Sequence, residues 1–180
     1  MALHDEIQSG DILLICPNKW FGRMIAKFTF GKVNHAALVY DKEKLFETDG
    51  DYWKAIFTNP DKEYGDRQLY IIRPSYIAGK TAKMKELCGK YENSPYSYWD
   101  LATNAVFSFL TRPIRSKVVG FFGSKKFMLC SELVSRIIYE TTGYKEWKNY
   151  EGITPEDIRD IALENPADHT IKFYDPKKEG

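Results

Sequence analysis

The chain has 180 residues and a formal net charge of +1, and 43% of its residues are hydrophobic. This length and composition are those of a soluble globular protein with one domain, residues 1–180. No apolar run approaches the roughly 20 residues that a membrane-spanning helix needs. The N-terminus lacks the basic region and apolar run of an export signal, so we expect a cytoplasmic protein, although an exported form trimmed of its signal would have the same sequence.

The chain contains three cysteines, Cys16, Cys88 and Cys130, and no CxxC pair. This pattern argues against a disulfide framework and against a zinc knuckle, and the three histidines are scattered singly. We therefore expect no metal and no other cofactor. A reducing compartment, or a thiol kept free for chemistry, is the natural interpretation.

In the first half of the chain, short apolar runs bounded by turn residues predict strands. The strands are expected at 12–16, 35–40, 45–48, 52–57 and 68–73, with a turn at 41–44. Residues 20–30 fit either a short helix or an ordered loop.

The second half is predicted to be mainly helical, at 77–91, 98–110 and 130–142, with an irregular stretch at 112–126. Thr154 and Pro155 begin another helix, because a threonine N-cap followed by proline and acidic residues is typical of a helix start. Residues 171–174 add a last strand. Strands followed by helices, with no linker and no internal repeat, predict an α+β domain.

Cys130 lies at the start of a predicted helix, in the stretch FMLCSELVSRIIYE. The apolar stripe of that helix follows it, at Leu133, Val134, Ile137 and Ile138. Unpaired backbone N–H groups and the helix dipole favour a thiolate at such a position. Cys130 is therefore a candidate nucleophile, and the alternative is a small hydrophobic residue at a helix start.

A thiolate nucleophile needs a base and usually a third group that orients the base. His35 opens a predicted strand (NHAALVY) and is the candidate base; the alternative is a histidine that only caps the strand. Glu47, on the return strand of the hairpin, is the candidate third residue, because a carboxylate beside Phe46 needs a partner. A contact between Glu47 and His35 depends on the strand register, and the alternative is an ordinary edge-strand glutamate.

The remaining histidines and cysteines receive structural interpretations. His4 and His169 lie near the termini in polar surroundings, and we expect both to be solvated. Cys16 ends a buried strand and Cys88 lies on a helix stripe, so both are expected in the core.

The ordered motifs GDILLI, NHAALVY, LFET, LCSELVSRIIY and ITPEDI resemble the circularly permuted branch of the NlpC/P60 papain-like superfamily, over roughly residues 9–164. This branch contains YiiX-like proteins and is related to the lecithin:retinol acyltransferase-like group. The resemblance implies a papain-like α+β fold of permuted topology, with an antiparallel sheet or small barrel packed against helices. It also implies that Cys130 is the nucleophile, His35 the base and Glu47 the third residue, with the histidine before the cysteine in the chain.

The segment PYSYWDL is similar to a Pro-Tyr-Asp segment of the same family, with Ser97 where Asp is usual. Tyr96 is therefore our candidate for a substrate-binding hydroxyl. The segment at about 105–127 is long for the family and is interpreted as an insertion.

Two windows of the sequence, 12–40 and 101–131, contain cations and aromatic residues but no acid. If the fold brings them together, the cleft is electropositive, which favours a thiolate and an anionic substrate such as a carboxylate or a lipid phosphate. The aromatic residues suit acyl chains or a membrane surface as partner, or else they lie in the core and the cations form a solvated rim. Nucleic acid is not expected as a partner, because few polar residues are present to read it.

These observations favour a cysteine hydrolase, an amidase or peptidase that acts on cell-wall-like peptides or other amides through a Cys130–His35–Glu47 triad and a thioester. One alternative is a lipid-directed thiol acyltransferase or hydrolase that uses the same residues. A second alternative is a non-enzymatic module that binds lipid or a membrane surface.

Overall fold

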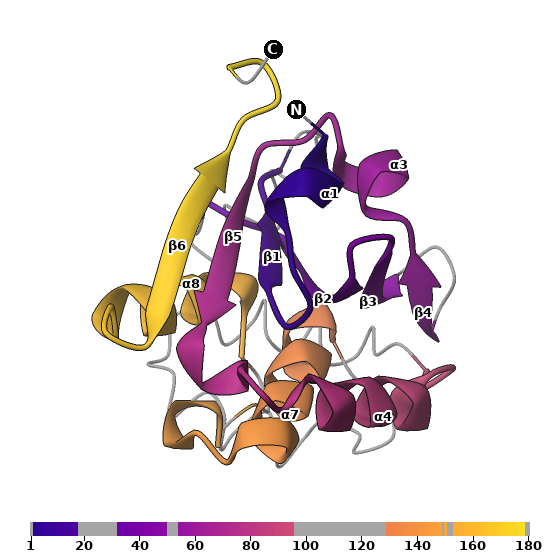
Figure 1. Ribbon diagram of the computed structural model, residues 1–180, viewed down its shortest axis with the longest axis vertical. Helices are drawn as coiled ribbons and strands as arrows, with labels where there is room; N and C mark the ends of the chain where they lie inside the picture. The colour runs from indigo at the N-terminus through magenta and orange to yellow at the C-terminus, as the bar shows by residue number, and fades with distance from the viewer. Residues whose placement is uncertain are drawn as a thin grey trace, which may run out of the picture.

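The computed structural model describes residues 2–17, 32–49, 54–95, 129–148, 150 and 153–178. Within these residues, six strands form one antiparallel sheet in the order β4-β3-β2-β1-β5-β6 (Figure 1). They are β1 (Ile12–Ile15), β2 (His35–Asp41), β3 (Lys44–Asp49), β4 (Lys54–Thr58), β5 (Leu69–Pro74) and β6 (His169–Tyr174). This antiparallel sheet with its helices confirms the predicted α+β fold, and among the described residues the sheet is open and does not close into the alternative small barrel.

Each predicted strand overlaps a strand of the sheet. The largest difference is the start of β6, which begins at His169 rather than 171; β4 is described from Lys54, and the predicted residues 52 and 53 lie outside the described residues. Short apolar runs located β1, β2 and β5 because these are the central strands of the sheet and are buried on both faces over most of their length.

Helix α7 (Cys130–Thr142) has its predicted bounds, and α8 (Pro155–Glu164) begins after the predicted Thr154 cap. Helix α4 (Thr81–Tyr91) starts later than predicted, because residues Ser75–Ile77 form a separate 3-10 turn, η1, and Gly79 adopts a left-handed conformation with φ 73°. None of the described helices combines the length and the hydropathy needed to span a bilayer.

Two short helices, α1 (Leu3–Glu6) and α3 (Pro60–Tyr64), and the 3-10 turn η2 (Lys145–Trp147) were not predicted, since such short elements carry no apolar periodicity. Helix α3 nevertheless has a recognisable start: the Asn59 side chain accepts the Lys62 N–H at 3.0 Å, and Pro60 occupies the first position. The interpretations given to 20–30, 98–110 and 112–126, and the insertion at about 105–127, lie outside the described residues.

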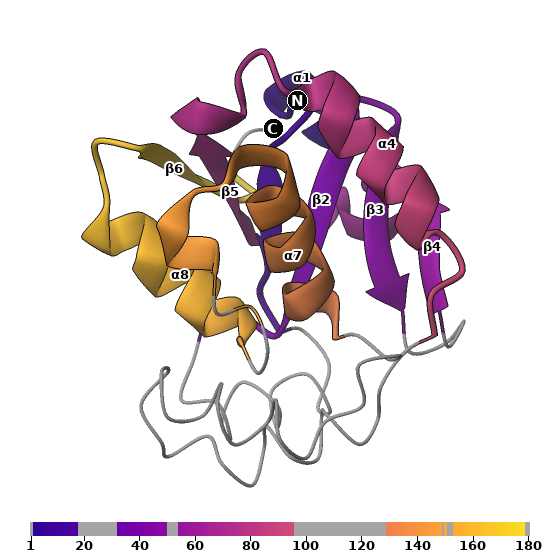
Figure 2. The ribbon, with the colours of Figure 1, turned by 90° about the horizontal axis from the view of Figure 1, so that it is seen from below.

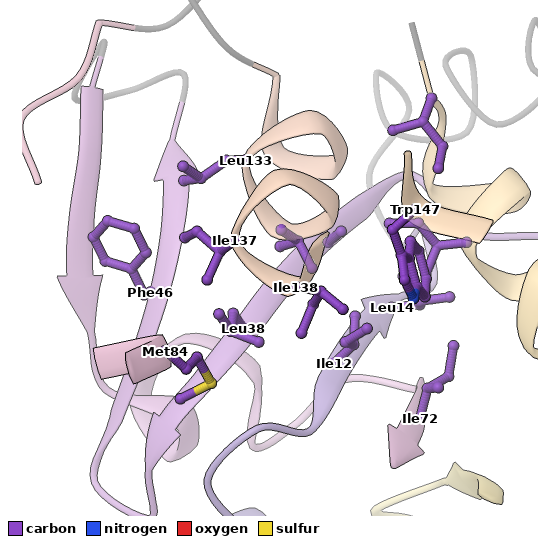
Figure 3. Packing of buried hydrophobic residues seen from close by; sticks show 14 of the residues in the cluster. Ile12, Leu14, Leu38, Phe46, Ile72, Met84, Leu133, Ile137, Ile138 and Trp147 are labelled. Carbon is purple, nitrogen blue, oxygen red and sulfur yellow. The ribbon is translucent and has the colours of Figure 1, made fainter. Parts of the chain in front are cut away.

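The larger core lies between one face of the sheet and helices α4, α7 and α8 (Figure 2). Alternate strand residues, among them Leu14, Leu38 and Phe46, point toward this face. The stripe of α7 packs against them, and Figure 3 shows Ile137 and Ile138 between the helix and the strands. This packing fixes the position of α7, and with it that of Cys130, relative to β2 and β3.

The opposite face of the sheet is covered by α1 and α3. Leu3 and Ile7 pack there on the other set of alternate strand residues, and Tyr64 of α3 packs against the same cluster. Because α3 and α7 lie on opposite faces, their side chains can meet in one site only where the sheet opens between two strands.

His169 is buried, with 6% of its surface exposed, so the prediction that it is solvated is wrong. Trp147 Nε1 donates to the Tyr76 hydroxyl at 2.6 Å, and that hydroxyl lies 2.7 Å from His169 Nε2. His169 Nδ1 lies 3.0 Å from the Asn165 carbonyl oxygen, so a neutral ring with its proton on Nδ1 satisfies every group of the chain. His4, in contrast, is exposed as predicted.

Burial lowers the pKa of His169 from its usual value of 6.5. As pH falls below that value the unfolded chain takes up a proton before the folded chain does, so this residue makes the free energy of unfolding decrease. In His169→Gln the amide oxygen still accepts from Tyr76, but the side chain does not titrate. We therefore expect the free energy of unfolding, measured in urea, to fall less between about pH 7.5 and about pH 5 in this variant than in the unaltered protein. Identical pH dependence in both proteins would contradict the assignment.

Candidate active site

Cys130 is the first residue of α7, and local contacts fix the helix start there. Leu129, just before it, is extended (φ −76°, ψ 160°), and its N–H donates to Glu132 Oε2 at 3.1 Å. Ser131 Oγ donates to the Ile153 carbonyl oxygen at 2.6 Å, which ties the helix start to the segment before α8. Cys130 is thereby held in a largely buried position at the positive end of the helix dipole.

The Cys130 sulfur lies where β2 and β3 part. Among the described residues, the pairing of the two strands does not continue past Leu38 and Phe46. Closer to the start of β2, the backbone N–H of Ala36 lowers the pKa of the Cys130 thiol, and the N–H of Ser131 does the same from the first turn of α7. One of these N–H groups comes from β2, beyond its pairing with β3, and the other comes from the start of α7. Together they favour a negative charge on the sulfur.

His35, the first residue of β2, links Cys130 to Glu47. Its Nε2 lies 2.6 Å from Glu47 Oε2. Since Nε2 is engaged there, Nδ1 is the ring nitrogen that remains for the hydrogen bond between His35 and the Cys130 sulfur. The His35 side chain is 22% exposed, whereas Glu47 has no exposed surface, so solvent reaches the imidazole but not its carboxylate partner.

Glu47 has three hydrogen-bond donors around its carboxylate. Oε2 accepts from His35 and, at 2.5 Å, from the Tyr64 hydroxyl, and Oε1 accepts from the Thr58 hydroxyl. Glu47 faces Ile56 across the β3–β4 ladder, and Thr58 lies two residues further along β4 on the same face. Tyr64 is the last residue of α3. The carboxylate is therefore surrounded by side chains from three different elements.

These contacts lower the pKa of the Cys130 thiol. Burial alone would raise this pKa, but the positive charge of His35, its hydrogen bond and the N–H groups of Ala36 and Ser131 outweigh burial. For His35, burial would lower the pKa, but the negative charge and the hydrogen bond of Cys130, followed by those of Glu47, raise it well above 6.5. Both shifts favour the thiolate–imidazolium form of the pair over the neutral form.

The pKa of Glu47 is lowered from its usual 4.5. Burial would raise it, but the hydrogen bonds from His35, Thr58 and Tyr64 and the charge of His35 prevail. A carboxylate beside the imidazolium stabilises the charged form of His35 and fixes the orientation of its ring.

The structure thus brings together the three side chains that the sequence proposed for catalysis, Cys130, His35 and Glu47. Tyr96 lies outside the described residues, as do all the cations of the two acid-free windows except Lys32. The electropositive cleft and the anionic substrate therefore stay predictions.

The other two cysteines lie elsewhere in the fold. Cys16 follows the last residue of β1 and is half-buried, whereas we had expected it in the core. Cys88 is buried on α4, as predicted.

Sequence reasoning missed Thr58 and Tyr64. The alternation of β4 could have placed Thr58 on the same face as Glu47 once the β3–β4 hairpin was assumed. Tyr64 gave no such signal, because it belongs to a helix of only five residues and lies 17 positions from Glu47 in the chain.

No family model matches the chain, and no curated protein sequence matches it. Among solved structures, the chain is similar to the metalloprotein YiiX from Escherichia coli O157:H7, with a TM-score of 0.50 and 17% sequence identity. The likeness covers 77% of this chain and 68% of that chain. The chain has a YiiX-like fold. This likeness confirms the predicted YiiX-like fold, and in this chain the histidine strand β2 precedes the cysteine helix α7.

A metal does not fit the side chains of this site. The described residues contain no group of three His, Cys, Asp or Glu side chains that could hold a metal ion. Cys130, His35 and Glu47 contact one another in a line, with one imidazole nitrogen engaged on each side, so their donor atoms do not converge on one point as ligands of a metal would.

The three cysteines provide an internal comparison of thiol reactivity. Burial raises the pKa of Cys16, and it raises that of Cys88 to about 12, whereas the pKa of Cys130 is lowered. Below about pH 7 we expect iodoacetamide to alkylate Cys130 far faster than Cys16 or Cys88, because the thiolate is the reactive form.

Peptide mass spectrometry after timed alkylation measures each cysteine separately. His35→Ala should remove the advantage of Cys130 without changing the rate at Cys16. A Cys130 that titrates like a free thiol, or that never reacts, would contradict the thiolate–imidazolium pair.

Proposed function

We propose that the protein is a cysteine hydrolase of the amidase or peptidase type, which acts through a Cys130–His35–Glu47 triad and a thioester intermediate. The observation that carries the proposal is the continuous chain of contacts from the Cys130 sulfur through both nitrogens of His35 to the buried Glu47 carboxylate. A buried thiol whose pKa is lowered by a specific partner is what a nucleophile requires, and a purely structural cysteine such as Cys88 shows the opposite shift.

In the first half of the reaction, the Cys130 thiolate attacks the acyl carbon of the substrate. The carbonyl electrons move to its oxygen, and the backbone N–H of Cys130 at the start of α7 is the proposed donor to that oxyanion. As the tetrahedral intermediate collapses, the Nδ1 proton of the His35 imidazolium passes to the leaving nitrogen. The amine departs, and the acyl group remains on sulfur as a thioester.

In the second half, the neutral His35 takes a proton from water at Nδ1 while the water oxygen attacks the thioester. Collapse releases the carboxylic acid and regenerates the thiolate beside an imidazolium. Glu47 does not exchange a proton in this scheme; it stabilises the positive charge of His35 whenever that charge is present. An ester substrate would follow the same steps with an alcohol as the leaving group. These three residues therefore support hydrolysis of an acyl compound but do not select between amides and esters.

Substitution of the three residues should reduce turnover to different extents. We expect Cys130→Ala to abolish activity, His35→Ala to reduce it by roughly 10²–10⁴-fold, and Glu47→Gln to cause a smaller loss, because an amide still accepts from His35 but carries no charge. The measurement is release of product from a panel of peptide amides and detergent-solubilised esters, with intact-mass detection of the acyl-enzyme. Full activity of Cys130→Ala would refute the scheme.

A further inference from the structure

We propose that Tyr64 and Thr58 are positioning residues for the Cys130–His35 pair, and that they act by keeping the Glu47 carboxylate ionised and fixed in orientation. This inference rests on the proposed function, since it concerns the reactivity of the same thiol. It goes further because it assigns a role to two residues outside the triad. That role is to set the lowest pH at which the Cys130 thiol remains reactive. Both residues act through Glu47, to which each donates a hydrogen bond.

The first line of support is the isolation of Glu47 from solvent. Its side chain has no exposed surface, so its charge depends on protein donors rather than on water. The groups that face it among the described residues are the His35 imidazole from β2, the Thr58 hydroxyl from β4 and the Tyr64 hydroxyl from α3. The Cys130 thiolate lies beyond His35 and adds a second negative charge to the set.

The second line of support is that Tyr64 is held in place independently of the triad. The Asn59 side chain caps the start of α3, and Asp61 of the same helix contacts His4 of α1 at 2.5 Å. The Tyr64 ring lies beside the His35 ring, with centroids 6.1 Å apart and planes tilted by 34°. Tyr64 therefore contacts both partners of the His35–Glu47 hydrogen bond.

The expected effect on the thiol has a definite sign. A hydroxyl that donates to a carboxylate stabilises its charged form, so removing the hydroxyl raises the pKa of Glu47. Once Glu47 is protonated, the imidazolium loses its counter-charge, and the proton of His35 moves to the Cys130 sulfur more readily. Loss of either hydroxyl should therefore make the thiolate disappear at a higher pH as the solution is acidified.

The variants Tyr64→Phe and Thr58→Val remove each hydroxyl and keep the shape of the side chain. The measurement is the rate of Cys130 alkylation by iodoacetamide as a function of pH, with peptide mass spectrometry to follow this cysteine alone. At about pH 5 we expect each variant to react about tenfold more slowly than the unaltered protein, the loss that corresponds to one hydrogen bond to a charged group. Near pH 8 the rates should agree.

Tyr91→Phe is the matched control. The Tyr91 hydroxyl donates to Glu140 Oε1 at 2.6 Å, so this variant also removes one phenol–carboxylate bond, but from a carboxylate near the end of α7 that is remote from Cys130 in the helix. Its alkylation profile should coincide with that of the unaltered protein. A similar acid-side loss in Tyr91→Phe would overturn the inference, because a general loss of stability would then explain the effect.

The other outcomes separate this inference from the proposed function. Unchanged profiles in both variants, or losses that are equal at every pH, would overturn the positioning role while the triad itself stands. Thr58→Val keeps the test decisive if Tyr64→Phe fails to fold. If Cys130 of the unaltered protein reacts no faster than Cys88, the proposed function fails, and this result is visible before any variant is examined.

Discussion

The buried charge of Glu47 is the constraint on which the rest of the site depends. Removing a carboxylate from water costs several kcal/mol unless hydrogen bonds and an opposite charge replace the lost hydration. Here the replacement comes from His35, Thr58 and Tyr64, so β2, β4 and α3 must all be in place around β3 before the charge is stable. The imidazolium that compensates Glu47 also compensates the Cys130 thiolate, and one positive charge thus lies between two negative ones.

The arrangement of the sheet explains how a thiol from one face reaches an imidazole supported from the other. Helix α7 packs on the face that carries Leu38 and Phe46, whereas Tyr64 lies on the opposite face. Both reach His35: Cys130 of α7 interacts with its imidazole, and the Tyr64 ring lies beside it with centroids 6.1 Å apart. The proposed function therefore depends on the opening between the strands, and the core packing of α7 determines how closely the sulfur approaches His35.

Residues with a local signal could be named as candidates from the sequence. Cys130 lies at the start of a helical stripe, and the turn at 41–44 brings Glu47 near the His35 strand, but their contact depended on the register, and the roles of the three residues came from the family resemblance. Tyr64 could not be proposed, since its contact with Glu47 depends on how a five-residue helix docks on the sheet. His169 was misjudged for a related reason: its neighbours in the chain are polar, while the aromatic groups that bury it come from distant segments.

The partly exposed His35 and the buried His169 lie at opposite ends of the sheet. His35 pairs with Ile15 at the end of β1, whereas His169 pairs with Pro74 at the far end of β5. Their pKa values are shifted in opposite directions: Cys130 and Glu47 raise the pKa of His35, whereas burial lowers the pKa of His169. Acid is therefore expected to act at two separate places: protonation of His169 lowers the free energy of unfolding, and protonation of the Glu47–His35–Cys130 set would remove the thiolate that the proposed function requires. A loss of activity at low pH that leaves the unfolding free energy unchanged belongs to the second effect alone.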